Sequence, residues 1–238
     1  MRSVARAAAS IQDSTSNVMS MAFKTIGLSD ELHAYVVAHG AAPDPLVARL
    51  TAETRSALSG LANMQIAPEQ APFLTIVTKL MKVNYAVEVG TFTGLSALSI
   101  ARALAPGGKL ICCDISDEFT SIARRYWHEA GVDDRIELRI APAAETLAAM
   151  PTEPHIDLAF IDADKTGYPT YWNEIVPRMR QGGLILVDNV LRGGRIVDPP
   201  TNPDDAAMVG FNDMVAADQR VEAMIVPFAD GVTMALKL

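Results

Sequence analysis

The sequence predicts an α/β fold, in which a mostly parallel sheet carries helices on both faces and ends in an antiparallel hairpin. Short apolar runs alternate with amphipathic stretches of helical period between residues 85 and 187. The last two apolar runs are joined by a short Asp230-Gly231 turn, which is typical of a hairpin. Because half of the 238 residues are hydrophobic, the chain can bury a sizeable core.

The expected elements follow from apolar runs and turn residues, taken in chain order. Residues 28–61 are predicted to be helical, with a break at residues 40–45. Pro68 then opens a helix over Glu69–Met81, because proline suits a first helical turn. Five buried strands are predicted, separated by helices, at Tyr85–Val89, Lys109–Ile115, Arg135–Ile140, Ile156–Ile161 and Gly183–Val187. The helices are Leu95–Leu104, Glu118–Ala130, Ala143–Met150, Tyr168–Met179 and Asp204–Ala217, and the hairpin strands are Val221–Phe228 and Val232–Leu238.

Composition narrows the class of protein. A net charge of −8 argues against binding to nucleic acid, which needs clustered Lys and Arg. No apolar run reaches the roughly 18 residues that span a membrane. Cys112 and Cys113 are adjacent on a strand and should point to opposite faces, which fits a reducing cytoplasm. We expect a disordered extension or a misplaced start over residues 1–20, an N-terminal helical segment over 21–67 and a catalytic domain over 68–238.

A glycine-containing turn follows the first strand and predicts a cofactor site. Gly90 and Gly94 let the backbone approach a ligand closely, and the next helix offers its positive N-terminus. Asp114, at the end of the second strand, can accept both hydroxyls of a ribose. The spacing is G-x-x-x-G and not the G-x-G-x-x-G of dinucleotide sites, and Glu88 would repel a diphosphate but suits a sulfonium and an ammonium group. This favours S-adenosylmethionine over a dinucleotide, although a turn without a ligand is an alternative.

Polar residues at two further strand ends predict a metal site. Asp162 ends the fourth strand, and Asp188 and Asn189 end the fifth, so all three should meet at one edge of the sheet. Carboxylate and amide oxygens suit Mg²⁺ most, with Mn²⁺ or Ca²⁺ as alternatives. Lys165 stands three residues after Asp162 and could act as a general base. Each of these residues alone could be a turn former, and the case depends on the set.

These motifs carry a family resemblance. Met64-Gln-Ile-Ala-Pro-Glu-Gln70, Glu88-Val-Gly-Thr-Phe-Thr-Gly94, Asp114 with Ser116-x-Glu118, Asp162-Ala-Asp-Lys165-Thr-Gly-Tyr168 and Asp188-Asn-Val-Leu191 resemble the cation-dependent O-methyltransferases of the caffeoyl-CoA O-methyltransferase type, in its bacterial form, and more distantly catechol O-methyltransferase. The resemblance implies a Rossmann-like class I methyltransferase fold with seven strands, and a homodimer whose N-terminal segment packs on the core. It implies cofactor contacts from Ile66, Glu88, Gly90, Thr91, Ser96, Asp114 and Ala143, metal ligation by Asp162, Asp188 and Asn189, and Lys165 as the base.

The predicted function is S-adenosylmethionine- and metal-dependent O-methylation of a catechol-like small molecule, with Asp162 and Lys165 as catalytic residues. Asp162 and Tyr171 are also predicted to contact the cofactor, since Tyr171 begins a helix next to the metal loop. The alternatives are an NAD(P)-dependent oxidoreductase and a catalytically silent binding module of the same fold. Arg192 and Gly193 depart from plant members, which commonly have an aromatic and then a polar residue there. Arg192 either meets an acidic acceptor or is a solvated loop charge.

Overall fold

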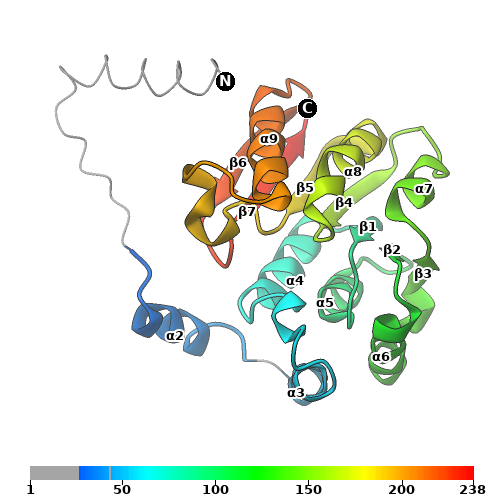
Figure 1. Ribbon diagram of the computed structural model, residues 1–238. Helices are drawn as coiled ribbons and strands as arrows, with labels where there is room; N and C mark the ends of the chain where they lie inside the picture. The colour runs from blue at the N-terminus through cyan, green and yellow to red at the C-terminus, as the bar shows by residue number, and fades with distance from the viewer. Residues whose placement is uncertain (1–26, 43) are drawn as a thin grey trace. The chain divides into compact units, whose positions relative to one another are not determined.

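A computed structural model describes residues 27–42 and 44–238 of the chain (Figure 1). The described residues divide into two units, one before residue 37 and one over residues 37–238. The first contributes the start of α2 (Asp30–Ala38), where the N–H of Leu32 donates to the Ser29 hydroxyl over 3.3 Å. The predicted extension over residues 1–20 lies outside the described residues. In the described part of the chain, no helix is both long and apolar enough to cross a membrane.

The second unit is built on a seven-stranded sheet of order β3-β2-β1-β4-β5-β7-β6. The first five strands are parallel, whereas β7 runs antiparallel to both β5 and β6. The strand order reverses between β1 and β4, and ligands of open α/β sheets bind at such a point. The strands are β1 (Tyr85–Val89), β2 (Lys109–Asp114), β3 (Ile136–Ile140), β4 (Ile156–Ile161), β5 (Met179–Val187), β6 (Val221–Val226) and β7 (Val232–Lys237).

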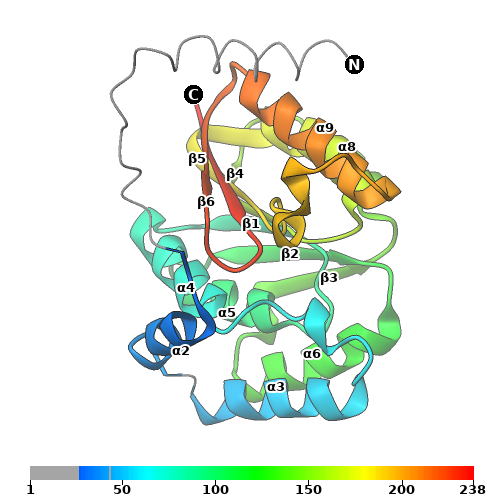
Figure 2. The same ribbon diagram turned by 60° about the vertical axis from the view of Figure 1, so that its left-hand side comes forward.

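Helices cover both faces of this sheet (Figures 1 and 2). One buried cluster joins the sheet to α3–α6 and the other joins it to α7–α9. Successive strand residues belong to opposite clusters: Cys112 packs in the first and Cys113 in the second, as predicted. The helices are α3 (Pro45–Ala57), α4 (Gln70–Met81), α5 (Leu95–Ala103), α6 (Asp117–Glu129), α7 (Ala143–Ala148), α8 (Tyr168–Ile175) and α9 (Pro203–Ala217).

Local chemistry explains where several helices begin. The side chains of Asp44, Ser116 and Asn202 each accept a hydrogen bond from a backbone N–H in the first turn of α3, α6 and α9. Pro45 and Pro203 follow two of these caps, at positions where a missing N–H costs nothing. These caps fix where the three helices start.

The predicted fold class is confirmed, including the C-terminal hairpin, in which β7 joins β5 and leaves β6 at the edge. The prediction for β5 was too short. The strand begins at Met179 and not at Gly183, and the helix expected to reach Met179 consists of α8, which ends at Ile175, and a 3-10 turn over Val176–Arg178. The Gly182-Gly183 pair resembles a turn in the sequence, but it lies within the strand, where Gly182 has a φ of +73°.

Candidate active site

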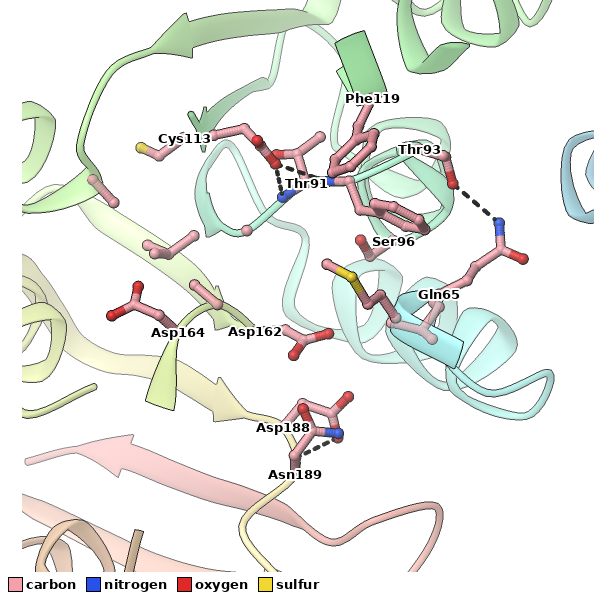
Figure 3. A pocket seen from close by; sticks show the side chains of 18 of the residues that line it. Gln65, Thr91, Thr93, Ser96, Cys113, Phe119, Asp162, Asp164, Asp188 and Asn189 are labelled. Atoms are coloured by element: carbon pink, nitrogen blue, oxygen red, sulfur yellow. Dashed lines mark hydrogen bonds between the residues drawn. The ribbon is translucent and has the colours of Figure 1, made fainter. Parts of the chain in front are cut away.

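A pocket of about 1080 Å³ opens at the carboxyl ends of the parallel strands, at the strand-order reversal (Figure 3). Its walls come from six places in the chain: residues 63–70, 89–96, 113–119, 141–144, 162–171 and 188–192. Ala229 and Asp230, between β6 and β7, complete the rim. Of the predicted site residues, the pocket is lined by Ile66, Gly90, Thr91, Ser96, Asp114, Ala143, Asp162, Lys165, Tyr171, Asp188 and Asn189, but not by Glu88.

The turn after β1, the predicted cofactor turn, passes so close to β4 that it requires glycine. A Cβ on Gly90 would lie 1.9 Å from the backbone oxygen of Asp162, and the residue has a φ of +89°. Gly94 is equally enclosed, because a Cβ there would lie 2.5 Å from that of Ala123. The indole N–H of Trp127 donates to the Gly94 carbonyl over 3.1 Å. The turn is therefore fixed against two neighbouring elements and leaves its pocket side open.

Asp114 holds this turn from the end of β2. One of its oxygens accepts the backbone N–H groups of Thr91 and Phe92, over 2.9 and 2.8 Å. The other oxygen accepts the N–H of Ser116 over 2.8 Å. Asp114 thus orders the cofactor turn and lines the pocket, where its remaining lone pairs can still accept ribose hydroxyls.

Glu88 lies behind the pocket wall and not on it. The side chain is completely buried, and the Thr91 hydroxyl donates to its Oε2 over 3.0 Å. Burial raises the pKa of Glu88 to about 7, although the hydroxyls of Ser96 and Thr91 work against this. Its Oε1 is buried without a hydrogen-bond partner in the described residues. The Glu88 carboxyl group therefore acts on the pocket indirectly, through Thr91 and Ser96, which both line it.

A short segment before α4 covers the pocket and is anchored at both ends. The amide of Gln65 donates to the hydroxyls of Thr54 and Thr93, over 3.2 and 3.3 Å, so it ties the segment to α3 and to the cofactor turn (Figure 3). At the other end, the N–H of Ala67 donates to the side-chain oxygen of Gln70 over 2.6 Å. Ile66 is held between these anchors and is 9% exposed. Its predicted position above the cofactor pocket agrees with this arrangement.

The three predicted metal ligands meet at adjoining strand ends (Figure 3). The Lys165 ammonium donates to Asp162 Oδ1 over 3.0 Å and to Asn189 Oδ1 over 2.6 Å, so both oxygens converge on one cationic centre. The same ammonium donates to the Tyr168 hydroxyl over 2.6 Å, and Tyr168 donates to the carbonyl of Asp188 over 3.1 Å. Two of the three predicted ligand oxygens therefore lie around one ammonium group, and carboxylate and amide oxygens are ligands that a hard metal ion prefers.

Asp188 supplies the third potential ligand from a nearly buried position. Burial and the neighbouring charge of Asp162 raise the pKa of Asp188 to about 7. Asn189 has a left-handed backbone, with a φ of +59°, and its N–H donates to Asp188 Oδ1 over 2.7 Å. In residues 27–42 and 44–238, no group of three or more His, Cys, Asp or Glu is arranged to hold a metal, and the predicted set contains two carboxylates and one amide.

Two aromatic residues that follow the Asp162–Lys165 segment differ in position: one lines the pocket and the other is in the core. Tyr171 lines the pocket, and its hydroxyl donates to Asp164, another wall residue. Burial and this acceptor raise the pKa of Tyr171 well above its usual value. Trp172 is fully buried against Phe211, with its indole N–H donating to Asp218 over 2.9 Å. Tyr171 can therefore contact a ligand, whereas Trp172 is a core residue.

Arg192 is not a solvated charge. Its side chain is 17% exposed and lines the pocket, and its Nε donates to Asp205 Oδ1 over 3.0 Å. Gln65 and Gln70 had no predicted role, although both stand in the Met64–Gln70 motif quoted for the resemblance. Phe92 and Phe119, which stack edge-to-face at 5.2 Å in the pocket wall, also had none. No chemical signal in the sequence marks such residues, because their roles depend on the fold.

Comparison with known proteins gives a consistent family assignment. The sequence model of the O-methyltransferase family matches residues 38–238. A Dictyostelium discoideum protein named "Probable caffeoyl-CoA O-methyltransferase 2" is 41% identical over 71% of this chain and 76% of its own length. An O-methyltransferase from Bacillus cereus, solved in complex with SAH, is 28% identical with a TM-score of 0.80, over 87% of this chain and 97% of that one. The O-methyltransferase TomG from Streptomyces achromogenes, solved with SAM, is 26% identical with a TM-score of 0.79, over 87% and 96%.

Proposed function

Because the chain belongs to the O-methyltransferase family, we propose that it transfers the methyl group of S-adenosylmethionine to a phenolic hydroxyl, assisted by a divalent cation. One observation carries the proposal. Oxygens of Asp162 and Asn189 converge on a single cationic nitrogen, beside a pocket built from the cofactor turn. The residues proposed to hold the cation and those proposed to hold the methyl donor thus line one pocket, as the reaction requires.

The methyl-donor half of the pocket fits S-adenosylmethionine by its charges. Asp114 presents carboxylate oxygens at the end of β2, where a ribose would lie, and Glu88 adds a buried acid behind Thr91 and Ser96. The unpartnered Oε1 of Glu88 favours positive groups near the turn, such as the sulfonium and ammonium groups of S-adenosylmethionine, over the negative diphosphate that a dinucleotide would place there. The Bacillus cereus and Streptomyces achromogenes enzymes, solved with SAH and SAM, support the same cofactor.

The acceptor half fits a vicinal dihydroxy phenol held at the cation. When bound to Asp162, Asp188 and Asn189, a Mg²⁺ ion would lower the pKa of the acceptor hydroxyl. Lys165, whose Nζ contacts Asp162 and Asn189, is placed to take the proton from that hydroxyl when its side chain is the neutral amine, which becomes the ammonium. S-adenosylmethionine, held by Asp114 and the turn after β1, would supply the methyl group and would leave as S-adenosylhomocysteine. The pocket walls supply orientation and exclude water.

The biological setting is proposed from the family resemblance for the dimer, and from the two cysteines, the acidic charge and the lack of a long apolar run for the rest. We expect a homodimer in the cytoplasm that acts on a small phenolic molecule, with no nucleic-acid or membrane partner. Size-exclusion chromatography with light scattering measures the first of these directly.

The test separates the cation site from the cofactor site. Replacement Asp188→Asn keeps the shape of a ligand but removes its charge, so Mn²⁺ binding measured by electron paramagnetic resonance should weaken by at least about tenfold. Methyl transfer should be lost with it, whereas S-adenosylhomocysteine binding by calorimetry should persist. The matched control is Asp164→Asn, a pocket carboxylate that bonds Tyr171 and lies outside the predicted ligand set. Full turnover after exhaustive chelation would contradict the role of the cation.

A further inference from the structure

Arg192 places a fixed positive charge in the acceptor wall of the pocket. In the part of the chain that the structure describes, Lys165 and Arg192 are the cationic side chains that line this pocket. Arg192 stands three residues after Asn189, a predicted metal ligand, and both residues line the pocket. It therefore lies within electrostatic reach of an acceptor bound at the cation.

A buried carboxylate holds this guanidinium in place. Asp205, near the start of α9, is 2% exposed and accepts the Nε of Arg192 over 3.0 Å. It also accepts two bonds from Arg195, over 2.9 and 3.2 Å, and one from the Asn202 amide over 2.8 Å. These partners hold the pKa of Asp205 well below its usual range, so the anchor stays charged. A guanidinium held in this way loses little side-chain freedom when it binds a ligand.

The backbone directs Arg192 into the pocket at a conformational cost. Arg192 has a φ of +51°, and Gly193 and Gly194 follow with +62° and +84°. Glycine adopts this left-handed region freely, whereas a residue with a Cβ adopts it only where its surroundings enforce it. Strain at a pocket residue, maintained by a buried ion pair, is typical of a side chain that is positioned for a ligand.

The two cationic side chains of the pocket differ in whether they have an N–H donor free to bind a ligand. The ammonium of Lys165 already donates to Asp162, Asn189 and Tyr168. Arg192 uses Nε for Asp205, and its Nη2 lies 3.7 Å from Asp204, but its Nη1 has no partner among the described residues. Arg192 thus keeps an N–H donor available to a ligand.

We propose that Arg192 is a specificity-determining residue that selects a dihydroxy acceptor carrying a carboxylate group. This inference rests on the proposed function, since the acceptor must be held at the cation for its substituent to reach Arg192. Five acids line the same pocket, at Asp114, Asp162, Asp164, Asp188 and Asp230, so an acidic acceptor would be repelled wherever no cation faces it. Asp230 belongs to the same wall as Arg192, because its Oδ1 accepts the N–H of Gly193, the residue that follows Arg192.

Two probes that differ in charge alone test the inference. Protocatechuate carries a carboxylate, and its methyl ester does not, while both present the same pair of hydroxyls. With S-adenosylmethionine and Mg²⁺, the ratio of kcat/KM for acid over ester should exceed one in the wild type. It should fall by about tenfold or more in Arg192→Gln, mainly through KM for the acid, because a charge-assisted hydrogen bond is lost. Arg192→Lys should restore part of the ratio.

Arg195→Gln is the matched control. Arg195 pairs with the same Asp205 but does not line the pocket and is 52% exposed, so its loss should change the ratio by no more than about twofold. S-adenosylhomocysteine binding by calorimetry checks that each variant is folded. An unchanged ratio in Arg192→Gln, with the ester still methylated, would overturn the inference and leave the proposed function standing.

Binding provides a second measurement that does not need turnover. In the presence of S-adenosylhomocysteine and Mg²⁺, the wild type should bind protocatechuate more tightly than its ester, and Arg192→Gln should not. A wild type that binds the ester at least as tightly as the acid would overturn the inference. A wild type that binds both probes but methylates neither would instead contradict the proposed function.

Discussion

The Glu88 carboxyl group is buried in the apolar core, so its protonation is linked to folding. Burial raises the pKa of Glu88 from an ordinary value of 4.5 to about 7, which corresponds to about 3 kcal/mol. Between these two pH values the unfolded chain releases the proton while the folded protein keeps it. The free energy of unfolding contributed by this group is therefore fully present below pH 4.5 and is lost as the pH rises through 7.

The replacement Glu88→Gln removes this pH dependence, because an amide does not titrate. We expect the stability of Glu88→Gln relative to wild type to rise by up to about 3 kcal/mol between about pH 4.5 and about pH 7.5. Urea unfolding at a series of pH values, without ligands, measures the difference, and other groups cancel because both proteins contain them. A difference that stays constant over this range would show that Glu88 does not titrate there.

At the scale of single residues, the sequence predicted site residues whose side chains suggest a chemical role. It missed residues whose role depends on their contacts in the fold. Asp114, Asp162 and Asp188 were predicted as a set of acids at strand ends, and the structure places all three in the wall of the pocket. Gln65 and Gln70 act by joining the covering segment to Thr93 and to the edge of the pocket, and the sequence does not reveal such pairings. Glu88 was found, but its depth behind Thr91 depends on packing.

At the scale of elements, the close passage of the β1 turn over β4 sets the geometry of both halves of the site. Gly90 faces the backbone of Asp162, so the replacement Gly90→Ala should force β1 and β4 apart. Gly107 offers a matched control, since it has a φ of +79° and a Cβ there would meet nothing within 4 Å. Gly107→Ala should cost only the left-handed backbone penalty of about 1–2 kcal/mol.

Gly90→Ala should cost about 1–3 kcal/mol more than Gly107→Ala, because of the overlap with Asp162. It should also weaken S-adenosylhomocysteine binding, which the control should retain. Chemical denaturation and calorimetry measure the two effects. Equal losses of stability in Gly90→Ala and Gly107→Ala would contradict this prediction, since they would mean that β1 and β4 can move apart without loss of free energy.

Element boundaries were predicted correctly where turn residues mark them, and they were missed where pairing between strands sets them. β1 and β4 were predicted to the residue, since each is a short run that is apolar except for one acid, with turn residues after it. β5 begins four residues earlier than expected, because Met179 pairs with Ile156 across a register shift. Such pairing depends on a partner strand and overrides the local signal of Gly182 and Gly183.

At the scale of the whole molecule, the pocket joins parts of the chain that are distant in sequence. Its lining runs from Asn63 to Asp230 and includes the covering segment, the ends of all five parallel strands and the hairpin turn. A ligand that fills it contacts both sides of the sheet's central reversal, so binding should stabilise residues 37–238 as one cooperative unit. The sequence predicted the strand ends from their order, whereas the hairpin turn became part of the rim only through the pairing of β7 with β5.

This cooperativity gives a test that separates the proposed cofactor from a dinucleotide. At about a hundred times its dissociation constant, a ligand stabilises the folded protein by about 2.7 kcal/mol. For a chain of this size, that corresponds to a rise in Tm of about 5–10 °C. We expect S-adenosylhomocysteine to produce such a rise in differential scanning calorimetry and NAD to produce none, because Glu88 and Asp114 favour positive charge beside the turn that would have to carry a diphosphate. An equal rise with NAD would favour the oxidoreductase alternative, and no rise with either would favour a silent module of the same fold.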